Sequence, residues 1–179
     1  MASPPDDDLV KDVFANYGLA AYLSHVLERS LVNALTTVYG PGPARLTEQQ
    51  LELRFQELSV KGIGALLSTL RDAGLSTEVL LVVQGALEDR NRLVNHFFWD
   101  HMVDIATDEG CHRMLAELTE VEHRFIECDA RVVEEVHRWA AAHGMTTTDF
   151  DAVQQATLER GRVLSGEEVD EVLGSSRQG

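Results

Sequence analysis

The chain has little positive charge, and this shortage excludes one broad class of partner. Of its 179 residues, 15 are Lys or Arg and 30 are Asp or Glu, which gives a formal net charge of −15. Broad affinity for nucleic acid depends on basic residues that neutralise phosphates, so this charge argues against it. We expect no DNA partner, although a small local basic site for RNA is compatible with the composition.

Long apolar runs and a secretion signal are also missing. No apolar run reaches the roughly 18 to 20 residues that span a bilayer, and residues 1–8 are acidic, unlike a signal peptide. The two cysteines, Cys111 and Cys128, fall in one predicted helix about 25 Å apart, too far for a disulfide. We therefore expect a cytoplasmic protein with no membrane partner and with reduced cysteines in its core.

Proline is scarce and aromatic residues make up only 6% of the chain, whereas apolar residues recur at helical spacing. This periodicity predicts helices over 9–38, 47–58, a short segment ending near Ala73, 76–106 and 111–143. The last of these has the most regular apolar seam, formed by Cys111, Met114, Leu118, Val121, Phe125, Cys128 and Val132. We predict an all-α fold, an up-and-down bundle of four main helices plus short helices over 1–145, followed by a short helix and polar tail over 146–179.

An arginine interrupts the apolar pattern of the 76–106 helix. Val83, Leu87, Val94 and Phe97 recur at apolar positions, and Arg90 falls among them. An unpaired buried charge costs several kcal/mol, so Arg90 is either half of a structural ion pair or part of a site. The structural interpretation pairs it with a carboxylate of the first helix, such as Glu28, and stacks His96 among aromatic rings.

The functional interpretation uses the polar residues around Arg90. Arg92, His96 and Asp100 recur every four residues and would share one helix face, while His101 would lie in the same row as Arg90. A guanidinium can hold a phosphate through two hydrogen bonds, and a histidine can move the proton of a ribose 2′-hydroxyl without a metal. On the residues alone, the structural interpretation is favoured.

Other chemistries find less support. Two Glu-x-x-His pairs, Glu120/His123 and Glu134/His137, resemble half-sites for a pair of metal ions, which require ligands from different helices. Both pairs lie on the predicted helix 111–143 and away from its apolar seam, so we interpret them as a solvated charged face. The chain also lacks a phosphate-binding glycine loop and a nucleophile elbow. We expect no metal and no cofactor.

The run Arg90-Asn91-x-Leu93-x-x-His96-Phe97-Phe98 resembles the signature of the HEPN superfamily, in which four to six residues separate an Arg, often followed by a polar residue, from a His; here five residues separate Arg90 from His96. Residues 25–28 and the break at 61–64 also look like features of bacterial bundles that carry this motif. Phe98 occupies a position where the family often has Tyr.

The resemblance implies a metal-independent endoribonuclease that acts as a toxin, in phage defence or in RNA processing. Arg90 would hold the scissile phosphate, His96 would act as acid and base, and Asn91 would orient one of them. The product would be a 2′,3′-cyclic phosphate. The resemblance also implies a homodimer and an antitoxin-like protein as a second kind of partner.

Two functions therefore remain open. One is the ribonuclease, with Arg92, Asp100, His101 and Glu28 in support; the other is a non-catalytic helical module for dimerisation or for binding a protein or nucleotide. The enzyme requires Arg90 and His96 to converge in an exposed cleft, within one chain or across a dimer axis. The binding module predicts that Arg90 is sealed against a carboxylate and that His96 is inaccessible.

Overall fold

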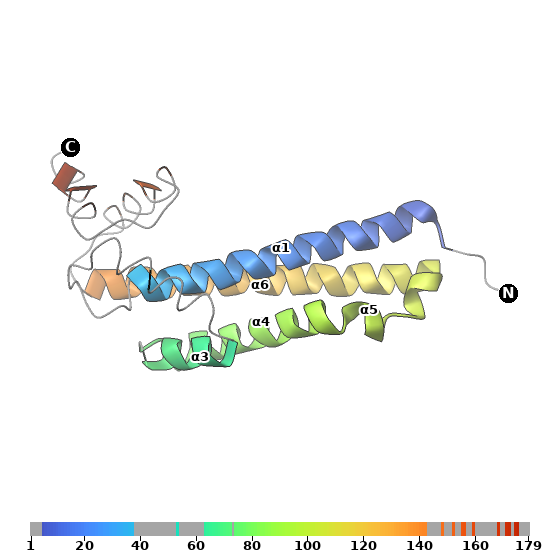
Figure 1. Cartoon of the computed structure of the whole chain (residues 1–179), viewed down its shortest axis with the longest axis horizontal. Coiled ribbons are helices and arrows are strands. Elements are labelled where there is room, and N and C mark those ends of the chain that lie inside the picture. The colour runs from blue at the N-terminus through green and yellow to red at the C-terminus, as the bar shows by residue number, and fades with distance from the viewer. Residues whose placement is uncertain are drawn as a thin grey trace. The chain divides into compact units, whose positions relative to one another are not determined.

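The computed structural model describes residues 5–37, 63–72 and 74–142, with isolated positions at 53 and between 148 and 175 (Figure 1). Its elements are α1 (Asp7–Thr37), α3 (Ile63–Asp72), α4 (Thr77–Asn95), α5 (Phe97–Asp100), the 3-10 helix η1 (Asp104–Ala106) and α6 (Asp108–Ala142). The predicted all-α fold is confirmed. An up-and-down bundle of four main helices stays a prediction, because the helix expected over 47–58 lies outside the described residues, as does the boundary at 145.

Contacts divide the chain into two units, each considered by itself. Unit 1 comprises Met1–Arg29 and Leu81–Ala130, and unit 2 comprises Ser30–Leu80 and Arg131–Gly179. Among the described helices, none combines the length and the apolar character needed to cross a membrane.

In unit 1, parts of α1, α4 and α6 pack around an apolar core. The buried side chains are Val13, Ala20 and Leu27 of α1, Val83, Ala86, Leu87 and Leu93 of α4, Phe97 of α5, and Cys111, Met114, Leu118, Val121, Phe125 and Cys128 of α6. Six of the seven residues of the predicted α6 seam are in this list, and the seventh, Val132, is buried in unit 2. The chain itself therefore covers the seam.

In unit 2, Gly74 and Ser76 fix the helix ends beside buried residues that include Leu70, Val79 and Val136. Gly74, with φ of +88°, ends the α3 segment as predicted, because glycine adopts this left-handed conformation without steric cost. Ser76 then caps α4: its Oγ accepts a hydrogen bond from the Val79 N–H at 3.4 Å.

The predicted helix over 76–106 is wrong in its second half. The helix ends at Asn95, His96 forms a turn, and α5 and η1 follow as separate short elements. The break coincides with two consecutive aromatic residues that pack on α1: the Phe97 and Phe98 rings lie 5.7 and 4.7 Å from the Tyr17 ring, centroid to centroid.

Burial near the end of α4 also differs from the prediction. Val94, predicted in the apolar row, is exposed, and its neighbour Leu93 is buried instead. The single helical row expected for Arg90, Val94, Phe97 and His101 is therefore interrupted at Val94. Arg92, His96 and Asp100 do share a face: the His96 N–H donates to Arg92 O, the Asp100 N–H donates to His96 O, and Arg92 contacts Asp100.

Candidate functional site

Arg90 reaches from α4 to α1. Its Nε lies 2.8 Å from Oε1 of Glu28, and the two side chains retain 24% and 28% of their exposure. The Nε–H does not point at the carboxylate, so the contact is an ion pair without the alignment of a hydrogen bond. The other Glu28 oxygen lies 3.5 Å from Nδ1 of His25. The partner predicted for Arg90 is confirmed, although the pair is half-buried and not sealed.

His96 and Asn91 lie on the solvent side of the same segment. His96 is exposed at the turn after α4, so the stacked position predicted for it is wrong; the histidine in contact with a ring is His101, at 4.8 Å from Phe97. Asn91 lies beside Arg90, and its Oδ1 accepts a hydrogen bond from Arg90 Nη1 at 3.4 Å. Within unit 1, the described contacts join Arg90 to Glu28 and Asn91 and do not bring it to His96.

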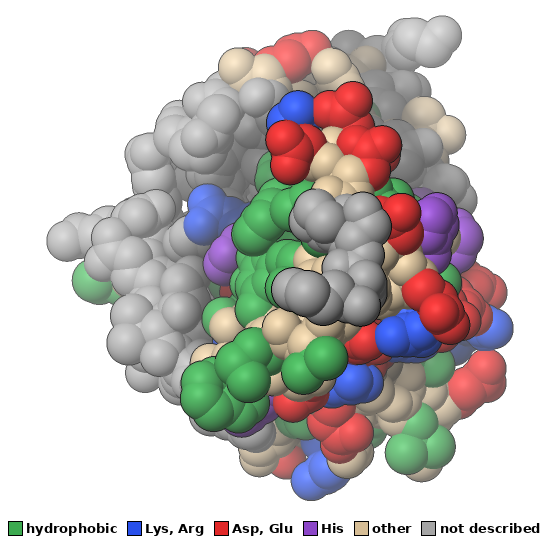
Figure 2. Space-filling view, turned by 90° about the vertical axis from the view of Figure 1, so that its right-hand side faces the viewer, with side chains coloured by type: hydrophobic (Ala, Val, Ile, Leu, Met, Phe, Trp, Pro, Cys, Tyr) green, Lys and Arg blue, Asp and Glu red, His purple; other side chains and the backbone are tan. Residues whose placement is uncertain are grey.

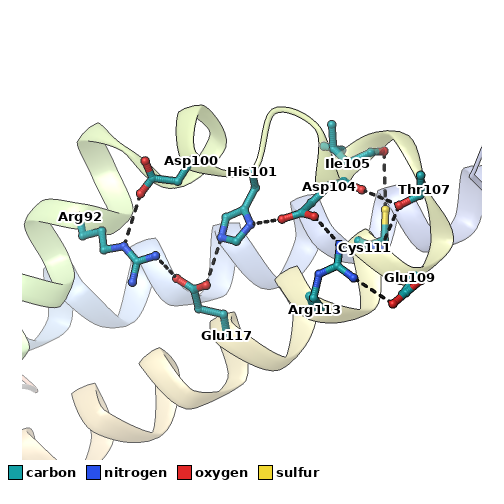
Figure 3. Close-up of polar contacts among 11 residues, drawn as sticks. Arg92, Asp100, His101, Asp104, Ile105, Thr107, Glu109, Cys111, Arg113 and Glu117 are labelled. Carbon is teal, nitrogen blue, oxygen red and sulfur yellow. Dashed lines mark hydrogen bonds and ion pairs between the residues drawn. The ribbon is translucent and has the colours of Figure 1, made fainter.

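The remaining predicted residues belong to a chain of side chains with alternating charge, shown in Figure 3. We call it the His101 network. In order, its members are Asp100, Arg92, Glu117, His101, Asp104, Arg113 and Glu109. Arg92 joins Asp100 to Glu117, at 3.5 and 3.0 Å, although Arg92 and Asp100 no longer share a regular helix. The network fastens the α4–α6 connection to the first turns of α6.

His101 occupies the centre of this network and is only 11% exposed. Its Nδ1 lies 2.8 Å from Asp104 Oδ2, and its Nε2 lies 3.1 Å from Glu117 Oε2. An ionised carboxylate accepts hydrogen bonds but cannot donate them, so both contacts are hydrogen bonds only when both ring nitrogens carry protons. Both ring nitrogens are thus engaged by carboxylates, and neither is left free to contact a substrate.

The same contacts act on Asp104. Hydrogen bonds from His101 and then from Arg113 hold the pKa of the Asp104 carboxyl below its usual value. The Arg113 Nη2 lies 2.5 Å from Asp104 Oδ1, and this hydrogen bond raises the pKa of Arg113 in turn. In each case the hydrogen bonds stabilise the charged form of the group, which lowers the pKa of the Asp104 carboxyl and raises the pKa of the Arg113 guanidinium.

Sequence reasoning missed Asp104, Glu109, Arg113 and Glu117. The spacings of three between His101 and Asp104, and of four between Glu109 and Arg113, could have indicated two of the pairs. The contact between His101 and Glu117 gives no such signal, because the path of the α4–α6 connection decides which α6 carboxylate meets the ring.

Every arginine between residues 81 and 130 is paired with a carboxylate. Arg90, Arg92 and Arg113 make the contacts above, and Arg124 Nε lies 2.6 Å from Asp89 Oδ2. Figure 2 shows the end of the molecule at which α1 begins, where basic (blue) side chains lie against acidic (red) ones. A phosphate would have to compete with a carboxylate for each of these guanidinium groups.

The Glu-x-x-His pairs and the cysteines are not members of the His101 network. Glu120 and Glu134 make ion pairs with arginines four residues later, Arg124 and Arg138. Within the described part of the chain, no group of three or more His, Cys, Asp or Glu residues is arranged to hold a metal ion. Both cysteines are free and buried, and burial raises the pKa of the Cys128 thiol to about 12.

Comparison of the chain with protein-family models, with curated proteins and with solved structures finds no match.

Proposed function

We propose that this chain is a non-catalytic helical module that binds a protein partner in the cytoplasm, and that Arg90 serves the fold. The observation that carries the proposal is the 2.8 Å ion pair between Arg90 and Glu28. It commits the guanidinium to α1, which leaves it poorly placed to clamp a scissile phosphate. His96 follows Arg90 by six residues, which in a regular helix is about 9 Å along the axis and 120° around it.

Charge supports the same function. The arginines that surround the motif are neutralised by carboxylates, and the chain as a whole is strongly acidic. Nucleic acid would therefore meet a repulsive surface, since gripping its backbone requires basic groups that can release counterions. A protein partner imposes no such requirement.

A HEPN-like, metal-independent endoribonuclease is the second candidate, and two observations favour it. His96 is exposed, contrary to what the binding module requires, and Asn91 contacts Arg90 as an orienting residue would. In this proposal Arg90 would release Glu28 to hold the phosphate, and His96 would act as acid and base, with the second half of the site supplied by another copy.

The test is cleavage of end-labelled mixed RNA in EDTA by the full chain. It is run with Arg90→Ala, His96→Ala and, as a matched control, Arg124→Ala, which also removes an ion-paired arginine but lies outside the motif. We expect no cleavage by any of these proteins. Cleavage that leaves cyclic-phosphate ends, is lost in the first two variants and persists in the control would overturn the module in favour of the ribonuclease.

A further inference from the structure

The connection between α4 and α6 holds three apolar side chains out in solvent. Trp99 of α5 and Met102 and Val103 of the turn that follows it are 77%, 63% and 77% exposed, and all three fall within five residues. Single exposed apolar residues are common on protein surfaces, whereas a group of them that includes a tryptophan is typical of a binding surface. We call Trp99, Met102 and Val103 the α5 patch.

The polar residues of the same stretch turn toward α6. His101 is 11% exposed and contacts Glu117, and Asp104 contacts Arg113, both within the His101 network (Figure 3). The usual surface pattern is therefore inverted here, with polar side chains against the protein and apolar side chains in solvent. Because these contacts hold the backbone that carries the α5 patch, a partner would not have to order it, and ordering a loop is one of the costs of association.

Acidic side chains gather at the end of unit 1 where the α5 patch lies. The exposed ones at or beside the starts of α1 and α6 are Asp6, Asp7, Asp8, Asp108 and Glu109. The two starts meet, because the Asp6 N–H donates to Asp108 Oδ1 at 2.9 Å, and Val103 precedes Asp108 by only five residues. Lys11 and Arg113 pair with two of these carboxylates, so the acids remain in excess. Figure 2 faces this end and shows hydrophobic (green) groups beside acidic (red) ones.

We propose that the α5 patch is a docking site for an amphipathic helix of a partner protein, one whose apolar face is flanked by Lys or Arg. Its apolar residues would cover the α5 patch while its basic residues meet the surrounding carboxylates. A helix with an acidic polar face, or a membrane with anionic headgroups, would meet like charge instead. The elements of the described residues are all helical, with no strand edge on which an extended peptide could pair, so a helix is the form of partner that fits.

This inference rests on the proposed function, a protein-binding module, and it names the surface and the chemistry of the partner. Three apolar positions make a small interface, below roughly 1,200 Å² in total. We therefore expect weak, micromolar binding that salt reduces by screening the attraction between the charges.

The probe is a synthetic helical peptide with leucine on one face and lysine on the other. It is titrated into the full chain carrying Trp139→Phe, in which Trp99 is the single tryptophan, so that a blue shift of the emission reports burial of the Trp99 ring. Two further peptides replace every lysine by glutamine or by glutamate and keep the leucine face. We expect the lysine peptide to bind most tightly and the glutamate peptide least tightly, and added salt to narrow the difference.

Met102→Glu separates docking on the α5 patch from general attraction to an acidic protein. The variant gains a negative charge, so binding through charge alone would strengthen, whereas docking on the α5 patch should weaken about tenfold or more because an apolar contact is lost. Ile126→Glu is the matched control: Ile126 is 53% exposed on α6 and lies outside the α5 patch, so binding should persist. Trp99→Ala, followed by calorimetry, should show the same loss as Met102→Glu. Circular dichroism checks that each variant keeps its helices.

Several results would overturn this assignment of the α5 patch. They are equal binding of the three peptides, lysine-peptide binding that survives Met102→Glu, and no shift with any peptide. A blue shift with neutral phosphatidylcholine vesicles but with none of the peptides would also overturn it and would assign the α5 patch to a lipid surface. A failed titration removes only this docking surface, whereas RNA cleavage through Arg90 and His96 would overturn the module itself, so the two failures are distinguishable.

Discussion

At the scale of single residues, Gly110 determines how closely the α4–α6 connection approaches α6. A Cβ at this position would lie 2.5 Å from the carbonyl carbon of Asp104 and closer still to its oxygen, and these are backbone atoms that cannot rotate away. The Gly110 N–H also donates to Thr107 Oγ1 at 3.1 Å, as part of the cap that starts α6. The absence of a side chain here lets the Asp104 backbone lie against the first turn of α6, where Asp104 also accepts a hydrogen bond from Arg113.

Gly110→Ala should therefore destabilise the protein by about 2 kcal/mol or more, because the connection must move to accept the new methyl group. Thermal or urea unfolding measures the effect. Gly85→Ala is the matched control: it lies within α4 with open space around its Cα, and there alanine should be neutral or stabilising by about 0.5 to 1 kcal/mol. Equal effects of the two changes would contradict this account of Gly110.

Asp104 should give stability a specific pH dependence. Its pKa is lower in the folded chain than in the unfolded one, mainly through the His101 hydrogen bond. The carboxylate therefore contributes stability above its unfolded pKa, near 4, and this contribution is lost as the pH falls through the lower folded value. In urea unfolding at a series of pH values, wild type should be more stable than Asp104→Asn near pH 5, and this margin should close as the pH falls further. Parallel curves down to the lowest pH would show that Asp104 has no special role.

At the scale of elements, ion pairs connect α4 to its neighbours in unit 1. The pair between Arg90 and Glu28 connects it to α1, and the pair between Asp89 and Arg124 connects it to α6. Because these residues are adjacent on α4, one turn of the helix contacts both neighbours through charges.

A double-mutant cycle on Arg90→Ala and Glu28→Gln tests the first of these connections. Each single change should lower the free energy of unfolding by about 1 to 2 kcal/mol, between the values for exposed and buried pairs, because the side chains are half-buried. The double variant should cost less than the sum of the two, since the second change removes a charge already left without its partner. Strict additivity would mean that the contact contributes nothing to stability.

The same elements show what could be predicted from sequence. The seam of α6 was correct because its spacing is uninterrupted over 111–132, and each of those side chains is buried. The end of α4 was missed because no proline or glycine lies in 91–101. Phe97 and Phe98 pack on Tyr17 of α1 directly after this point, and contacts between residues so far apart in the chain leave no local signal.

The candidate site could likewise be predicted only in part. Glu28 could be named as the partner of Arg90, because a guanidinium in an apolar row requires a carboxylate from a neighbouring helix. The His101 network could not be derived, because it depends on how the connection over 101–107 folds back onto α6. Local spacing identifies pairs within one helix, whereas contacts between elements depend on the path of the chain between them.

At the scale of the whole molecule, α1 and α6 differ in where their apolar residues lie. The chain buries the α6 seam in its own core, whereas Leu19, Tyr22 and Val26 of α1 are exposed.

The pairing of the arginines between residues 81 and 130 has a consequence for how fast partners find this protein. Since carboxylates neutralise those cations locally, the field that extends into solvent is set by the surplus of acidic groups. Diffusing polyanions are slowed on approach, whereas proteins with a basic surface are attracted and oriented before contact, most strongly at low ionic strength. With its arginines paired within the chain and its net charge negative, the protein should associate faster with basic proteins than with polyanions.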